Sequence, residues 1–225
     1  MTEDAITYRV RRCCNGGPGS HRRLIEPAEQ IRDTTPHEWT GEVVEEIARH
    51  EEPRWVNVAL HEAGHAVVAI GLGARVNGAQ IDGAPLASID FSGVLWRASV
   101  MILEAGDIAK NWGVQWHDSP CDEELVEHAR AIRELPFGFC DRCRTFIQIV
   151  SKIGLDVPDT EYLKCYRDLE GQTIDIVRRR NVWTAIEELA DALMEHGVLT
   201  GQQVHDIVEP LVPIGSLKIG EEDVV

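Results

Sequence analysis

One short run of residues, His61-Glu62-Ala63-Gly64-His65, has the spacing of a metal-dependent hydrolytic site. Residues four positions apart on an α-helix lie on the same face, so the imidazoles of His61 and His65 can both reach one tetrahedral zinc ion. Zinc lowers the pKa of a bound water to about 7, and Glu62 is placed to take the proton of that water. The run therefore predicts a zinc site with Glu62 as general base. The alternative interpretation is two partly buried histidines on an amphipathic helix.

A third zinc ligand must come from elsewhere, because a catalytic zinc normally has three protein ligands and one open position. Acids and histidines that follow the motif are the candidates, and their residue types and spacing do not choose among them. They are Glu104, Asp107, His117, Asp118, Asp122, Glu123, Glu124 and His128.

Two cysteines, Cys140 and Cys143, are separated by two residues and are candidates for half of a second zinc site. A structural zinc site needs four ligands, and the other cysteines of the chain, Cys13, Cys14, Cys121 and Cys165, are the candidates to complete it. A redox role needs a strand–helix context that the sequence does not indicate. The interpretation that we favour is two ordinary thiols.

The elements that must position these residues are mainly helices. The motif lies on a helix whose first turn contains Pro53 and which stops at Gly71 and Gly73. Residues 74–93 carry short apolar stretches between glycines and a proline, which indicates a strand or hairpin. Further helices are expected at Gly41–His50, Val94–Lys110, Ser119 to before Pro136, Arg144–Ile153, 159–181, Asn181–His196 and from Thr200 onward. The sequence therefore predicts a mainly α fold with one small β hairpin or sheet.

The chain divides into three parts. Residues 1–38 contain glycines and a basic cluster without sustained periodicity, which favours a flexible N-terminal arm. Residues 39–212 form the predicted helical domain, and residues 213–225 are expected to form a C-terminal tail.

Composition excludes several classes of function. The formal net charge of the 225-residue chain is −16, which disfavours nucleic acid and anionic lipid as partners. No window reaches the roughly 18 consecutive apolar residues of a membrane span, and the N-terminus lacks a secretory signal. Six cysteines are too few for a disulfide scaffold. We therefore expect a cytoplasmic protein that binds neither membranes nor nucleic acid.

The motif and its surroundings resemble the peptidase domain of the FtsH family of zinc metalloproteases. Residues 55–69, WVNVALHEAGHAVVA, are similar to the zinc-binding helix of that family, and residues 103–109, LEAGDIA, to its glycine-containing helix. Residues 122–129 occupy the place of the helix start that supplies the third ligand, an aspartate. The resemblance spans about residues 54–208, and its poorest part is residues 134–175.

This resemblance implies that Asp122 is the third zinc ligand, with Glu124 or Asp118 as alternatives. The pattern around Asp122 also fits a simpler role, since Ser119-Pro120-Cys121-Asp122 has the form of a capping box whose acid follows the Ser cap by three residues.

The chain also departs from the family. The family carries an ATPase module and usually membrane spans, whereas this sequence contains no Gly-x-x-x-x-Gly-Lys-Ser/Thr phosphate loop. Lys110 and Asn111 replace the acidic residues that usually end the family's glycine helix. We therefore expect a zinc metalloendopeptidase with one zinc per chain that acts on peptides or unfolded proteins without ATP. This expectation is compatible with a separate partner protein. The alternatives are a non-catalytic zinc-binding interaction or regulatory module and a zinc hydrolase of non-peptide substrates.

Overall fold

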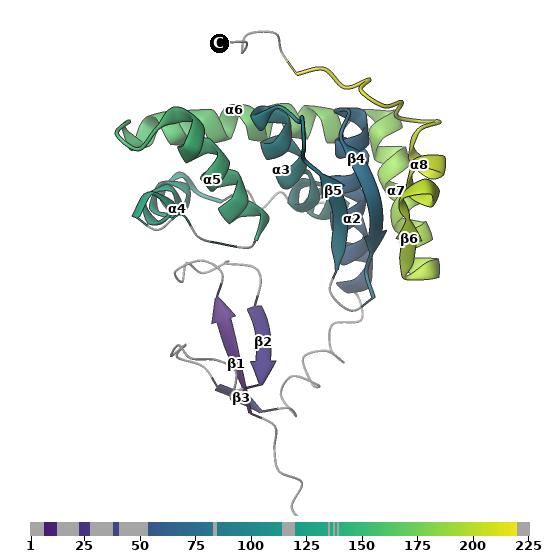
Figure 1. Cartoon of the computed structure of the whole chain (residues 1–225), viewed down its shortest axis with the longest axis horizontal. Coiled ribbons are helices and arrows are strands. Elements are labelled where there is room, and N and C mark those ends of the chain that lie inside the picture. The colour runs from purple at the N-terminus through teal and green to yellow at the C-terminus, as the bar shows by residue number, and fades with distance from the viewer. Residues whose placement is uncertain are drawn as a thin grey trace, which may run out of the picture.

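The computed structural model describes residues 7–12, 23–27, 38–40, 54–82, 85–113, 120–134, 136, 138 and 140–219. Within this described part the chain forms seven helices and two three-stranded antiparallel sheets. The predicted mainly α fold with a small β element is confirmed (Figure 1).

The helices follow the sequence pattern closely. They are α2 (Arg54–Gly71), α3 (Trp96–Gly113), α4 (Asp122–Glu134), α5 (Asp141–Ile153), α6 (Asp159–Val177), α7 (Arg180–His196) and α8 (Gly201–Val208). The difference from the predicted bounds that bears on the site is at α5, which begins three residues earlier than expected. Asp141 is therefore the first residue of this helix.

Helix α2 lies at the centre of the helical body, between α3 on one side and α7 on the other (Figure 1). Its small and branched side chains are fully buried, including Ala59, Ala63, Ala66, Val67 and Ile70. At Gly64 an added Cβ would lie 2.6 Å from the carbonyl oxygen of Ala105 in α3. The glycine of the motif thus allows the two helix backbones to approach closely.

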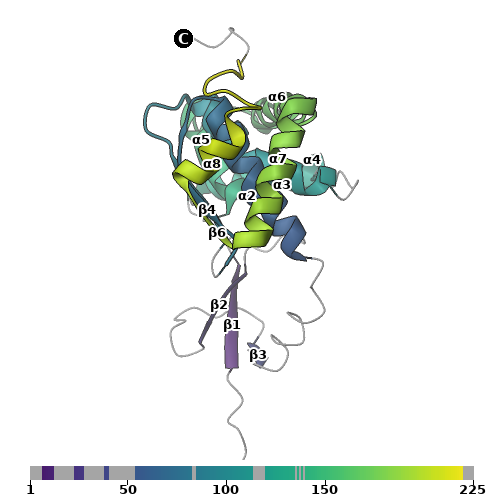
Figure 2. The same ribbon diagram turned by 90° about the vertical axis from the view of Figure 1, so that its right-hand side faces the viewer.

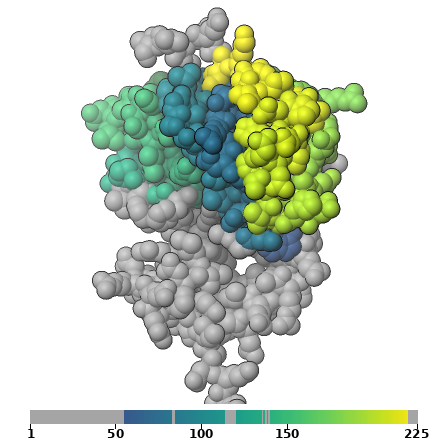
Figure 3. Space-filling view, turned by 45° about the vertical axis from the view of Figure 1, so that its right-hand side comes forward, coloured from purple at the N-terminus to yellow at the C-terminus, as the bar shows by residue number. Residues whose placement is uncertain are grey.

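A three-stranded sheet packs against the same helix. It has the order β5 (Leu86–Asp90), β4 (Arg75–Gln80), β6 (Val198–Thr200), with both pairs antiparallel. Strand β6 was not expected from the sequence, but the capping box that follows it at Thr200 opens α8 as predicted. Strand β6 and helix α8 (Gly201–Val208) lie beside β4 on one face of the molecule (Figures 2 and 3).

Parts of the terminal segments also have regular structure. β1 (Thr7–Arg12) pairs with β2 (Arg23–Pro27) and β3 (Glu38–Thr40), where the sequence indicated a flexible arm. In the predicted C-terminal tail, Leu217 is buried and its backbone N–H donates to the carbonyl of Gly71. The expected helix at Gly41–His50 lies outside the described residues.

Among the residues that the structure describes, none of the helices combines the length and the apolar character needed to cross a membrane.

Candidate metal centre

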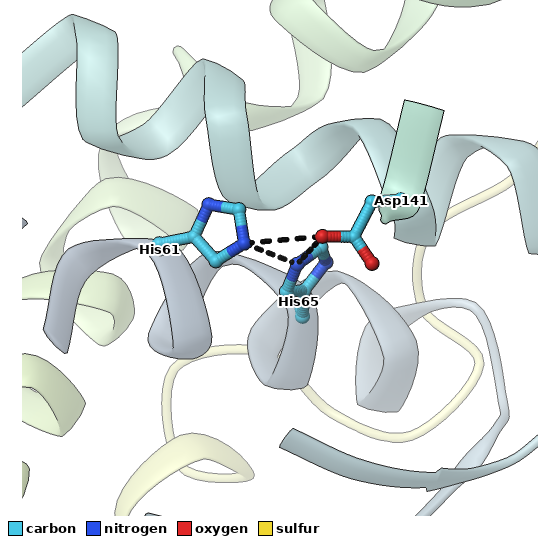
Figure 4. A group of neighbouring side chains, drawn as sticks. All are labelled: His61, His65 and Asp141. Carbon is cyan, nitrogen blue, oxygen red and sulfur yellow. Dashed lines mark hydrogen bonds and ion pairs between the residues drawn. The ribbon is translucent and has the colours of Figure 1, made fainter. Parts of the chain in front are cut away.

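His61, His65 and Asp141 come together at one point between α2 and α5 (Figure 4). The Nε2 atoms of the two histidines lie 3.0 Å apart. The Oδ2 atom of Asp141 lies 3.2 Å from Nε2 of His61 and 3.4 Å from Nε2 of His65. All three ligand atoms therefore face one another from two helices that are far apart in the sequence.

This triangle has the dimensions of one face of a zinc tetrahedron. Ligand atoms about 2.1 Å from a tetrahedral zinc ion are roughly 3.4 Å apart. Two imidazole nitrogens and one carboxylate oxygen are also a donor set that catalytic zinc uses, with the fourth position left open. Both the distances and the chemistry of the three residues fit a zinc ion.

The backbone of α3 positions the ring of His65 from the side away from the other ligand atoms. Its Nδ1 atom lies 2.6 Å from the carbonyl oxygen of Ile102, which fixes a proton on Nδ1 and leaves Nε2 as the ligand atom. Helix α3 passes so close to the rings that a Cβ at Gly106 would lie 2.4 Å from Nε2 of His65 and 2.8 Å from Cε1 of His61. Glycine at position 106 is therefore required for the site.

His61 lies between two carboxylates. Its Nδ1 atom is 3.4 Å from Oδ1 of Asp107, and its Nε2 atom faces Asp141. Burial disfavours the charged ring, but the hydrogen bonds to Asp107 and Asp141, together with the negative charges of Asp107 and Glu62, outweigh burial and raise the pKa of His61 to about 10. The site thus stabilises positive charge at this position, and a metal ion that binds there displaces the His61 proton.

Asp141 remains ionised for the complementary reason. Burial disfavours its charged form, but His65 and His61 beside it hold the pKa of its carboxyl well below its usual range. A carboxylate that is already ionised binds a cation without first losing a proton.

Glu62 lies beside the cluster and is almost completely buried, with 2% of its surface exposed. Its Oε2 atom accepts a hydrogen bond of 2.7 Å from the backbone N–H of Ala87 in β5. Its charge is close enough to His61 to contribute to the raised pKa of that ring. The edge strand of the sheet therefore orients the predicted general base.

The structure does not bring Asp122 to the histidines, so Asp141 replaces it in our assignment of the third ligand. Asp122 is the first residue of α4, and its Oδ1 atom accepts hydrogen bonds of 3.1 and 2.6 Å from the guanidinium of Arg167. The capping acid of α4 is Glu124, which accepts a hydrogen bond from the N–H of Cys121. Asp122 therefore lies with Arg167, and Ser119, its partner in the predicted capping box, lies outside the described residues.

Three further candidates for the third ligand, Glu104, Glu123 and His128, are described and are not part of the cluster. Buried Glu104 accepts a hydrogen bond of 2.7 Å from the hydroxyl of Tyr166. His128 packs on the ring of Phe146, and burial lowers its pKa to about 4. Glu123 is exposed on α4. His117 and Asp118 lie outside the described residues.

Cys140 and Cys143 lie at the start of α5, on either side of Asp141 in the sequence. Both are buried, and the backbone N–H of Cys143 donates to Sγ of Cys140, which caps α5. Among the described residues, the group placed to hold a metal is His61, His65 and Asp141. Cys13 and Cys14 lie outside that part of the chain.

Sequence reasoning missed Asp141 because the start of α5 lacks the usual signals. Its cap is a cysteine, a weak acceptor, and neither Ser, Thr, Asn nor Pro precedes Asp141 closely. One signal was available: Cys143 is buried and lies three residues before buried Phe146, which extends the helical period toward the N-terminus.

No protein-family model matches this chain, and a search of curated proteins finds no match. The resemblance to the FtsH peptidase domain therefore stays a prediction from the motif and its surroundings.

Proposed function

We propose that this protein is a zinc-dependent metallopeptidase whose metal is held by His61, His65 and Asp141. The observation that carries the proposal is the triangle of ligand atoms, 3.0 to 3.4 Å apart, next to the buried carboxylate of Glu62. When bound, zinc supplies a Lewis acid that makes hydroxide available from water at neutral pH.

The protein's own residues handle binding and proton transfer. Asp141 and the two imidazoles hold the cation, and Ile102 fixes the proton of His65 on the side away from it. Glu62 accepts the proton of the attacking water on a carboxylate oxygen and then delivers it to the leaving amine. The hydrogen bond from Ala87 keeps the Glu62 side chain in one orientation during both steps.

The substrates that fit this proposal are peptides and unfolded proteins. Unfolding a stable domain requires roughly 5–15 kcal/mol, and an enzyme without a motor must wait for it to occur spontaneously. We therefore propose cleavage that does not depend on ATP, unless a separate partner protein delivers folded substrates. Digestion of a casein-like substrate and of a stably folded protein, each with and without ATP, separates these cases.

A second candidate function is a non-catalytic zinc-binding interaction or regulatory module. The observation that favours it is the burial of Glu62 together with its hydrogen bond to Ala87, which restricts the approach of a substrate to the carboxylate. In this case the metal stabilises the contact between α2 and α5, and the protein acts through its partners.

Elemental analysis together with casein cleavage decides between the two functions. The wild type is expected to hold about one zinc per chain, and His61→Ala with His65→Ala to hold none. Glu62→Gln is expected to keep its zinc and lose cleavage by at least about a hundredfold, because an amide cannot accept the proton. Glu123→Gln, which removes the same charge from an exposed site, is the matched control.

Each other outcome has a definite meaning. Cleavage by Glu62→Gln at the wild-type rate refutes its role as base. Bound zinc without cleavage in the wild type favours the non-catalytic module, and full zinc content in the double histidine variant refutes the metal site itself.

A further inference from the structure

We propose that Asp107 is a positioning residue of the metal centre, which acts on the metal only through His61. The inference rests on the proposed zinc site. Asp107 lies on α3, and its Oδ1 atom is 3.4 Å from Nδ1 of His61, while Nε2 of the same ring faces Asp141 and His65. The carboxylate and the metal position are therefore at opposite edges of one imidazole.

The two ring nitrogens of a neutral imidazole have different roles, since one carries a proton and the other offers a lone pair. A carboxylate at Nδ1 stabilises the proton there and leaves Nε2 free to bind a cation. His65 meets the same requirement through the carbonyl of Ile102. Each histidine thus has its own acceptor at Nδ1, which is the carbonyl of Ile102 for His65 and the carboxylate of Asp107 for His61.

Lys110 keeps Asp107 in this supporting role. Its Nζ atom donates a hydrogen bond of 3.0 Å to Oδ1 of Asp107, the same oxygen that faces His61. The ammonium group partly neutralises the carboxylate and ties it to α3. Both contacts hold Asp107 on the Nδ1 side of the His61 ring, away from the triangle formed by the three ligand atoms.

The geometry distinguishes this role from direct ligation. The ligand atoms that cluster are those of His61, His65 and Asp141, and Asp107 is not one of that group. Gly106 brings α3 against both rings, which places the next residue, Asp107, at the outer edge of His61. Asp107 therefore orients a ligand and raises its basicity without contacting the ion.

The test is zinc affinity, measured by competition with a chromophoric chelator, for the wild type, Asp107→Ala and Asp107→Asn. Loss of the acceptor is expected to weaken zinc binding by about tenfold to a hundredfold in Asp107→Ala. The amide oxygen of Asp107→Asn can still accept the Nδ1 proton, so this variant is expected to recover most of the loss. Asp168 lies on α6 and pairs with Arg97 of α3, so Asp168→Asn removes the same charge away from the metal centre and is expected to bind zinc as the wild type does.

Two further readouts separate positioning from a merely structural role. The visible absorption spectrum of the cobalt-loaded protein is expected to change in Asp107→Ala, because the spectrum depends on the orientation of the His61 ligand. The midpoint of thermal unfolding without metal is expected to stay near the wild-type value, while the increase produced by zinc becomes smaller.

Zinc affinity within twofold of the wild type in Asp107→Ala overturns the inference. So does equal loss in the Ala and Asn variants with an unchanged cobalt spectrum, because the carboxylate then acts by charge or by folding alone. A wild-type protein that binds no zinc refutes the proposed function as well, whereas zinc-binding wild type with an unaffected Asp107→Ala refutes only the role of Asp107.

Discussion

The starts of α4 and α5 each present an aspartate as the first helical residue, yet the two side chains have opposite surroundings. Asp122 on α4 is 60% exposed and pairs with Arg167, whereas the Asp141 side chain on α5 is 18% exposed and faces two imidazoles. Both positions suit an acid, since the helix dipole favours negative charge at an N-terminus. What separates the two aspartates is the group that the fold places opposite each carboxylate.

Glu104 is a third carboxylate for this comparison, because it is buried but does not face the two imidazoles. It is buried as deeply as a ligand would be, but its hydrogen-bond partner is the neutral hydroxyl of Tyr166. Burial dominates and raises the pKa of Glu104 to about 7, although Thr145, Tyr166 and the charge of Arg142 oppose the increase. At Asp141 the two imidazoles outweigh burial, whereas at Glu104 the neighbouring groups do not.

The largest expected effect separates the two aspartates directly. Asp141→Ala is expected to weaken zinc binding by at least about a hundredfold, because it removes one of three protein ligands. Asp122→Ala is expected to change zinc affinity by less than about twofold, since its contacts are with Arg167. Chelator competition on both variants measures the contrast. If zinc affinity falls in Asp122→Ala and not in Asp141→Ala, our assignment of the third ligand is wrong.

A smaller effect concerns the pH dependence of stability at Glu104. The pKa of this carboxyl is 4.5 when unfolded and about 7 when folded, so between these values the folded protein holds a proton that the unfolded chain has lost. The free energy of unfolding therefore falls as pH rises through this window, on the order of 1–3 kcal/mol.

Glu104→Gln is expected to abolish this contribution, because the amide is neutral at every pH and can still accept the Tyr166 hydrogen bond. Urea unfolding of the wild type and the variant at pH 5 and pH 8 measures the difference, with Glu123→Gln as the exposed control. An identical pH slope in the wild type and Glu104→Gln contradicts the raised pKa.

The smallest expected effect is the stability cost of Asp122→Ala. An exposed ion pair with Arg167 at a helix start contributes less than about 1 kcal/mol, and added salt reduces this value. Urea unfolding at low and high ionic strength measures it. A cost of several kcal/mol would show that Asp122 has a structural role that its exposure does not indicate.

The helical pattern was largely predictable because its signals are local. The apolar spacing of α2, α3 and α7 and the capping box before α8 depend on neighbours within a few residues, and these helices form where expected. The third ligand was not predictable from the same signals. The FtsH resemblance, together with the helix-start signals at residues 119–122, favoured Asp122, whereas α5 begins at a cysteine cap that the usual preferences do not mark.

The sequence by itself determined the pair of imidazoles and their adjacent acid, because helical periodicity places His61 and His65 on one face wherever that helix lies. Only the tertiary structure decided which carboxylate completes the group, since Asp141 is 80 residues from His61 and meets it through the packing of α5 beside α3. It likewise decided which acids stay charged. The pKa of a carboxyl depends on burial and on the cations that face it, and both are set by residues distant in the chain.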